Sequence, residues 1–246
     1  MAKLDRTTFE SSREGEYFDA RQLSALTGVP QEQFASVCLK ELVDNALDAC
    51  ETAQVAPEVG VEVEREDGVL RLSISDNGPG LPPEVVGKVL DYSIRVSDKA
   101  AYRSPTRGAQ GNALKTIIGI PYALGQRREP TVVEACGIRH TIMPWVDPAG
   151  EVHISHTEVP ATVAGTSVNL VIPEEGQDFD PLHWVRSFAA FNPHATFRYK
   201  VKRPLQKWPK FTNRPADYHS RSTYPPSQPR RIGTVRRLFR YSYSAT

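Results

Sequence analysis

The hydrophobic positions of residues 31–53 recur with the period of an α-helix. Glu41, Asn45 and Asp48 are spaced i, i+4 and i+7, so at about 100° per residue they share one face. The other arc carries the apolar side chains Leu39, Leu42, Val43, Ala46, Leu47 and Cys50. The pattern predicts a helix that packs with one face and presents two carboxylates and an amide with the other. Taken alone, the stripe also fits a surface helix with a solvated acidic face.

The rest of the chain alternates between strand-like and helix-like patterns. Residues 59–66 and 68–76 alternate with period two around a Glu-Asp-Gly turn, which predicts a β-hairpin. Further strands are expected at 131–135, 138–146, 152–156, 166–172 and 196–201. Further helices are expected at 82–89, 112–118 and 181–191, with a loop over 92–112.

Composition favours a soluble protein of the cytoplasm. The 246 residues contain no apolar run near the roughly 18 residues of a membrane span, and the polar start does not resemble a signal peptide. Three cysteines without a C-x-x-C motif argue against a disulfide framework or a cysteine zinc site, and we expect buried free thiols. His153 and His156 are three apart on an expected strand, so they should point to opposite faces and not share a metal.

Charge is distributed unevenly along the chain. From Arg198 onward there are 13 Lys and Arg against the single acid Asp217, whereas the preceding residues hold 17 basic and 28 acidic residues. Residues 203–246 are also rich in proline and poor in apolar side chains, which predicts an extended or disordered arm. Such a basic tail is able to neutralise DNA phosphates. A solvated linker is the alternative interpretation.

The loop that follows the second hairpin strand carries a carboxylate next to two glycines. Asp76 ends the strand, and Gly78 and Gly80 permit backbone approaches that a Cβ would block. A carboxylate at this place is able to accept a hydrogen bond from an exocyclic amine such as that of adenine. A simple Asx turn between strand and helix remains the alternative for this loop taken alone.

A second glycine-bearing loop, residues 106–115, runs directly into an apolar helix. Backbone N–H groups at a glycine-opened helix start bind anions, and Arg107 and Lys115 add positive charge. Leu114 stands where a Walker A motif has glycine, so a P-loop is excluded. The strand-bound G-x-G-x-x-G of a dinucleotide fold is missing as well.

In their order and spacing these motifs resemble those of the GHKL ATPases, which share the Bergerat fold. The motifs are Glu-x-x-x-Asn at 41–45, Asp-x-Gly-x-Gly at 76–80, Gly-x-x-Gly at 108–111 and Gly-Thr at 165–166. Three stretches narrow the resemblance to the topoisomerase VI B subunit: Lys-Glu-Leu-Val-Asp-Asn-Ala-Leu-Asp-Ala at 40–49, the lid that starts at Thr106, and Phe-Asn-Pro-His-Ala-Thr-Phe at 191–197. The resemblance covers roughly residues 15–202.

The resemblance implies a fold and a domain organisation. The fold is α/β, an α+β two-layer sandwich in which a mixed, mostly antiparallel sheet is covered on one face by helices. Residues 29–202 would form the ATP-binding domain and residues 1–28 a strap-like segment across a nucleotide-driven homodimer. Residues 203–246 would be the basic tail.

The resemblance also implies roles in the first two motifs. Glu41 matches the general base that activates water, Asn45 matches the ligand of Mg²⁺, and Asp48 matches a polar position near the nucleotide. Asp76 matches the carboxylate that binds adenine. Three further residues match positions around the adenine, namely Gly78, Gly80 and Thr166.

The remaining implied nucleotide contacts belong to the phosphate lid and the loop before it. Ser97 and Lys99 match the loop that approaches the nucleotide. The lid itself comprises Arg107, Gly108, Ala109, Gln110, Gly111, Asn112, Ala113, Leu114 and Lys115. Because Ala113 replaces the third glycine of the lid, we expect slower lid closure rather than loss of binding.

By this resemblance the chain is expected to bind ATP and Mg²⁺, to hydrolyse ATP slowly, and to serve DNA topology or another DNA transaction. Its expected partners are DNA, a second copy of the chain and a DNA-cleaving subunit. No association with a membrane is expected. Sensor histidine kinases share the fold but lack a base at the position of Glu41, which argues against kinase activity. Only about 45 residues follow the body, so we expect a fragment, a truncated copy or a partner-dependent subunit. A nucleotide-gated binding module without meaningful turnover and a non-nucleotide scaffold are the alternatives.

Overall fold

The computed structural model describes residues 14–92 and 113–202 in full and residues 239–241 as backbone. The strands are β1 (Glu58–Glu66), β2 (Val69–Ser75), β3 (Thr131–Ala135), β4 (Ile138–Val146), β5 (Val152–Pro160), β6 (Thr166–Pro173), β7 (Thr196–Lys202) and β8 (Phe239–Tyr241). They form one eight-stranded sheet in the order β5-β4-β3-β6-β2-β1-β7-β8. Only the β1–β7 and β7–β8 pairs are parallel among these strands, so the sheet is mixed and mostly antiparallel.

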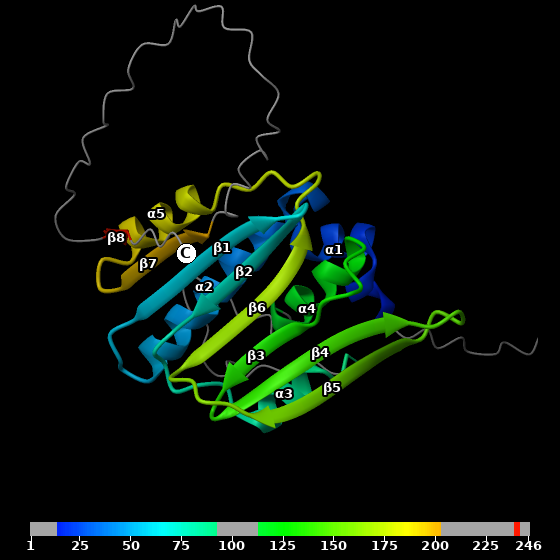
Figure 1. Cartoon of the computed structure of the whole chain (residues 1–246), viewed down its shortest axis with the longest axis horizontal. Helices are drawn as coiled ribbons and strands as arrows, with labels where there is room; N and C mark the ends of the chain where they lie inside the picture. Colours follow the sequence, from blue (N-terminus) through cyan, green and yellow to red (C-terminus); the bar gives the residue numbers. More distant parts are fainter. Residues whose placement is uncertain (1–13, 93–112, 203–238, 242–246) are drawn as a thin grey trace, which may run out of the picture.

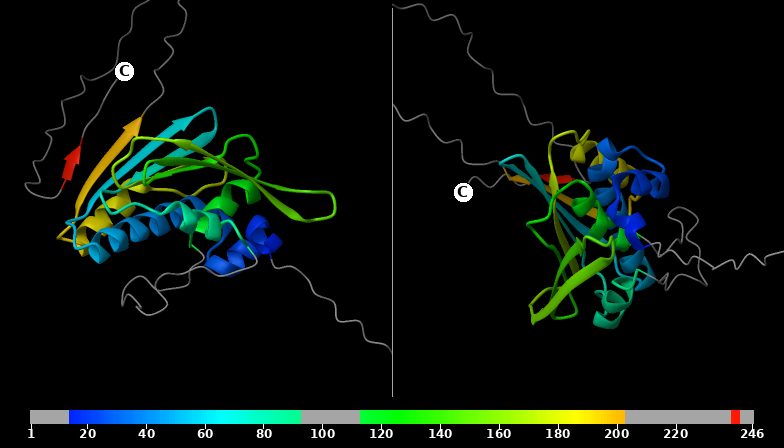
Figure 2. Two further views of the ribbon diagram at one scale, coloured as in Figure 1. Left: turned by 90° about the horizontal axis from the view of Figure 1, so that it is seen from below. Right: turned by 90° about the vertical axis from the view of Figure 1, so that its right-hand side faces the viewer.

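The helices cover one face of this sheet (Figures 1 and 2). They are η1 (Glu14–Phe18), α1 (Ala20–Thr27), η2 (Gln31–Gln33), α2 (Phe34–Thr52), α3 (Pro83–Val89), α4 (Ala113–Ala123) and α5 (Pro181–Phe191). This arrangement confirms the expected α/β two-layer fold. Among the helices of the described ranges, none combines the length and the apolar character that crossing a membrane requires.

Two elements run further than the hydrophobic pattern predicts. The helix α4 continues past Ile118 to Ala123, through Gly119 and Pro121, because these residues are enclosed on all sides by protein. The strand β5 continues past His156 to Pro160, since it pairs with β4 from Val146↔Val152 to Ile138↔Pro160. The second half of β5 is largely exposed on both faces, so its sequence does not alternate between hydrophobic and polar residues.

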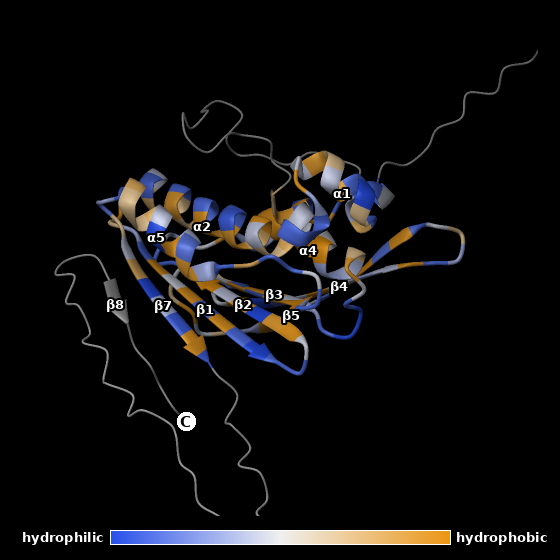
Figure 3. Ribbon diagram, turned by 90° about the horizontal axis from the view of Figure 1, so that it is seen from above, coloured by the Kyte–Doolittle hydropathy of each residue, from blue (hydrophilic) through white to orange (hydrophobic). Residues whose placement is uncertain are grey.

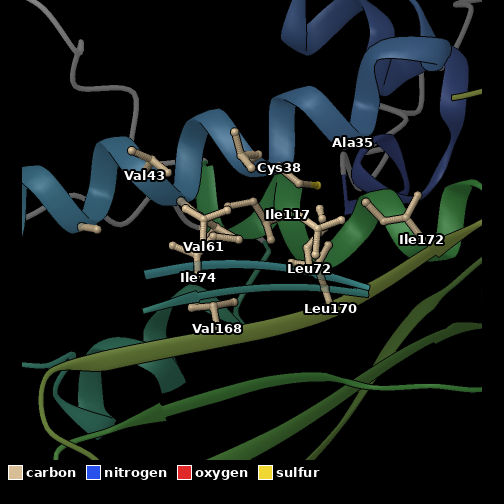
Figure 4. Packing of buried hydrophobic residues seen from close by; sticks show 14 of the residues in the cluster. Ala35, Cys38, Val43, Val61, Leu72, Ile74, Ile117, Val168, Leu170 and Ile172 are labelled. Carbon is tan, nitrogen blue, oxygen red and sulfur yellow. The ribbon is translucent and has the colours of Figure 1, made fainter. Parts of the chain in front are cut away.

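The core lies between α2 and the central strands (Figures 3 and 4). The apolar stripe of α2, including Leu39, Val43 and Leu47, is fully buried, as the helical pattern predicts. It packs in one cluster with side chains of β1, β2 and β6, among them Val61 and Leu72. Each such side chain contributes about 1.5–3 kcal/mol when it leaves water. Packing therefore fixes the rotation of α2 and directs its polar stripe away from the sheet.

The segment before α2 packs against α4 of the same chain. Tyr17 and Phe18 of η1 meet Tyr92 and Tyr122 in a small aromatic cluster, with Tyr17 and Tyr92 ring centroids 5.2 Å apart. The approach is so close that a Cβ on Gly119 would lie 1.9 Å from the Tyr17 carbonyl oxygen. Residues 14–27, which belong to the expected strap-like segment, are therefore seated on the body in this structure.

We predict that Gly119→Ala displaces η1 from α4. Overpacking against the Tyr17 carbonyl costs about 1–3 kcal/mol of unfolding free energy, more than the roughly 1 kcal/mol that alanine gains over glycine in a helix. Urea unfolding and amide hydrogen exchange of residues 14–27 measure the effect. Gly87→Ala is the matched control, because a Cβ there meets nothing within 4 Å and the change should be neutral or stabilising. Equal stability of the two variants would contradict the prediction.

Candidate nucleotide site

The polar stripe of α2 is graded in exposure. Asn45 is exposed, the Glu41 side chain is about one-third exposed at 31 %, and Asp48 is buried. Lys40 Nζ lies 2.9 Å from Glu41 Oε1 and 3.0 Å from Asp44 Oδ2. Burial alone would lower the pKa of Lys40, but its bonds to these two carboxylates raise it. Lys40 thus stays charged and holds the Glu41 carboxylate in place on the helix surface.

Asp76 is fixed where β2 leaves the sheet. Its backbone N–H donates to the Thr166 carbonyl at 2.9 Å, which extends the β2–β6 ladder by one residue. Its side-chain Oδ1 accepts from the N–H groups of Gly78 at 2.8 Å and Thr166 at 3.2 Å. Burial raises the pKa of this carboxyl, and the bonds from Gly78 and Thr166 oppose that rise. The result is a half-buried acceptor with a fixed orientation.

Two glycines allow the backbones around Asp76 to meet. Gly165 has φ +76°, and a Cβ there would lie 2.0 Å from the Asp76 carbonyl oxygen. Gly80 has φ +87°, and a Cβ there would lie 2.7 Å from the sulfur of Cys136 in the β3–β4 turn. Three segments therefore converge on this loop only because both positions lack a side chain.

Asn77 is a structural residue of this loop whose importance the local sequence pattern does not reveal. Its Oδ1 accepts from the Glu58 N–H at 2.8 Å and from Cys50 Sγ at 3.3 Å, and its Nδ2 donates to the Ala56 carbonyl at 3.0 Å. These bonds tie the Asp76 loop to the end of α2 and the start of β1. A weak signal in the sequence was an amide between Asp76 and a glycine, a combination typical of a side chain that bonds to nearby backbone.

The loop that carries Asp76 also packs directly on α2, which carries the polar stripe. A Cβ on Gly78 would lie 3.4 Å from Ala49 Cβ, so the loop packs on the turn of α2 that follows Asp48. The end of the polar stripe on α2 and the Asp76 carboxylate therefore belong to one region of the helix-covered face.

The expected lid is described only at its end. Eight of the predicted contacts lie outside the described residues: Ser97, Lys99, Arg107, Gly108, Ala109, Gln110, Gly111 and Asn112. Ala113 and Leu114 open α4 and are partly buried. Lys115 is 1 % exposed, its Nζ donates to the Asp91 carbonyl at 2.6 Å, and it lies 5.4 Å from the Tyr92 ring centroid. Burial lowers the pKa of Lys115.

The thiols differ from the expectation at one position. Cys38 and Cys50 are buried, as predicted, but Cys136 is exposed. Cys136 occupies the tight β3–β4 turn with φ +49°, which places it at the rim of the Asp76 loop rather than in the core. Burial raises the pKa of the Cys50 thiol.

The sequence model of the family described as histidine kinase-, DNA gyrase B-, and HSP90-like ATPase matches residues 31–119. This range runs from η2 through α2 and the Asp76 loop into α4. Over residues 31–119 the chain is thus similar to the GHKL ATPases. The match contains Glu41, Asn45, Asp76 and Lys115, whereas Thr166 lies beyond it.

Curated relatives of the chain are B subunits of type 2 DNA topoisomerase 6. The relative from Archaeoglobus fulgidus is 28 % identical over 188 residues, which cover 65 % of this chain and 28 % of the relative. The relative from Natronomonas pharaonis is 29 % identical over 200 residues, covering 78 % and 23 %. The relative from Methanosarcina mazei is 36 % identical over 105 residues, covering 42 % and 16 %. The chain thus spans about a quarter of the length of the first two relatives.

We predict that Gly165→Ala lowers the unfolding free energy by more than its left-handed backbone angle alone explains, because the new Cβ displaces the Asp76 loop. Gly176→Ala is the matched control, because Gly176 also has φ +76° but a Cβ there meets nothing within 4 Å. Both variants should lose about 1–2 kcal/mol of unfolding free energy from the left-handed backbone. Gly165→Ala should lose about 1–3 kcal/mol more from the clash with Asp76, as measured by urea unfolding. Similar losses in the two variants would show that the loop tolerates the displacement.

Proposed function

We propose that this chain binds ATP with Mg²⁺ and hydrolyses it slowly, as a domain of topoisomerase VI B type. The observation that carries the proposal is the Asp76 carboxylate, held by Gly78 and Thr166 beside the end of α2. The GHKL match, which contains α2, Asp76 and Gly78, supports the same function.

The residues around Asp76 fit an adenine. A half-buried carboxylate with a fixed orientation accepts from an exocyclic amine and discriminates against a base that presents a carbonyl there. Gly78 and Gly80 let the loop pack closely on α2 and on the β3–β4 turn, which fixes the surroundings of the carboxylate. Thr166 adds a backbone and a hydroxyl bond to the same carboxylate, and so orients it.

The polar stripe of α2 fits a hydrated Mg²⁺ and an attacking water. Carboxylate and amide oxygens are the ligands that Mg²⁺ prefers, and Asn45 presents such an oxygen on the exposed face. When bound, the metal would neutralise phosphate charge. Glu41, one helical turn earlier, would accept the proton of the attacking water, and Asp48 would orient polar groups one turn later.

The lid would close over the phosphates. The proposed lid comprises Arg107 through Lys115, and Ser97 and Lys99 belong to the loop before it. Lys115 now donates to the Asp91 carbonyl, so its ammonium must exchange that partner for a phosphate when the lid closes. Closure is therefore a conformational step with its own cost.

The wider role follows the relatives, which are B subunits of type 2 DNA topoisomerase 6. We propose that closure of the lid drives homodimerisation, with residues 1–28 as the strap. The basic residues 203–246 would contact DNA phosphates, and a DNA-cleaving subunit would act on that DNA.

Two observations favour a second candidate, a nucleotide-gated binding module without meaningful turnover. Lys115 is buried against Tyr92, and Glu41 is paired with Lys40. In this alternative ATP binding would release these contacts and change the affinity for a partner, with little hydrolysis.

Glu41→Gln separates the two candidates. For an ATPase we predict that ATP affinity stays within a few-fold while Mg²⁺-dependent phosphate release falls by about 10²–10⁴-fold, since the amide cannot accept the water proton. Glu51→Gln is the control on the same helix: Glu51 pairs with His194 at 2.9 Å, and its loss should leave turnover unchanged. ATP binding with no measurable turnover in the unmodified chain would favour the gated module instead.

A further inference from the structure

A cluster of two histidines and a glutamate lies on the edge hairpin, outside the proposed nucleotide site. His140 on β4 is fully buried, and its cross-strand partner in the sheet is Glu158 on β5. His156 pairs with Ile142, a core residue two positions after His140, so all three polar residues share the side of the sheet that faces the helices. His153 lies on the opposite face, stacked on Trp145, as the period-two pattern predicts.

The three side chains point their ligand atoms at one another. His140 Nδ1 lies 3.0 Å from His156 Nε2 and 3.3 Å from Glu158 Oε1, and the last two atoms are 3.7 Å apart. A tetrahedral zinc ion with bonds of about 2.0–2.1 Å keeps adjacent ligand atoms about 3.4 Å apart. The triangle thus has the size of one face of a zinc tetrahedron.

We infer that His140, His156 and Glu158 form a Zn²⁺ site, which goes beyond the proposed nucleotide function. Two imidazoles and one carboxylate suit zinc better than Mg²⁺ or Ca²⁺, which prefer oxygen ligands. Three protein ligands leave the fourth position to water. The exposure of Glu158, 48 % for its side chain, gives the ion a route from solvent.

The three ligand atoms already contact one another without a metal, and one of the two facing ring nitrogens carries a hydrogen that the other accepts. His140 Nε2, on the far side of the ring, is buried with no hydrogen-bond partner among the described residues, and a metal at Nδ1 would not change that. The triangle of ligand atoms, and not this nitrogen, therefore points to an ion. An ion that bridges β4 and β5 would stabilise the edge of the sheet.

A second group on the same hairpin provides the matched control. Asp147, Glu151 and His153 also lie within reach of one ion. Their geometry is explained by a local turn, because Asp147 Oδ1 accepts from the N–H groups of Ala149 and Glu151. This turn is expected to bind no zinc of comparable affinity.

Zinc titration of the whole metal-free chain by calorimetry tests the site. We expect one Zn²⁺ per chain, a higher Tm with zinc, and tetrahedral absorption bands when Co²⁺ replaces it. His156→Ala and Glu158→Gln should each weaken zinc binding by at least about tenfold and abolish the rise in Tm. His153→Ala should bind zinc as the unmodified chain does.

Three results would overturn the proposal. The first is no zinc binding by the unmodified chain, which would leave the cluster as a hydrogen-bonded pair of histidines beside a carboxylate. The second is zinc binding that survives both His156→Ala and Glu158→Gln. The third is zinc binding that is lost in His153→Ala, which would move the site to the Asp147 turn.

Discussion

The meeting of two strand ends at Asp76 is the constraint on which the site depends. Asp76 leaves β2 and Thr166 enters β6, and they exchange one backbone bond and one bond to the carboxylate. The contact exists only because Gly165 has no side chain to collide with the Asp76 carbonyl. Asn77 then fastens the same loop to the end of α2. The sheet, the helix and the carboxylate are thereby held as one unit.

The rotation of α2 follows from the core rather than from the site. Its buried stripe is anchored by strands β1, β2 and β6, and this packing directs Glu41 and Asn45 away from the sheet. Lys40 adds local order by bridging Glu41 and Asp44. Stability and chemistry thus use opposite faces of a single helix.

Most of the fold was predictable because it follows the period of the hydrophobic residues, whereas what was missed depends on strand pairing, turn geometry and contacts that this period does not encode. The stripe of α2 and the β1–β2 hairpin were evident locally, the latter from Asp67 and Gly68, which both adopt positive φ at the turn. The extension of β5 depends on pairing with β4, and the exposure of Cys136 depends on a turn. The partner of Lys115, the Asp91 carbonyl, lies 24 residues away and follows no local pattern.

Calorimetric titration of ATP into the unmodified chain and into Asp76→Asn tests whether Asp76 binds the base of ATP. The substitution keeps the size of the side chain but replaces a charged acceptor with an amide. We expect the unmodified chain to bind ATP and Asp76→Asn to bind it at least about tenfold more weakly, since hydrogen bonds to charged groups contribute about 1.5–3 kcal/mol. Equal affinities, or no binding by the unmodified chain, would contradict it.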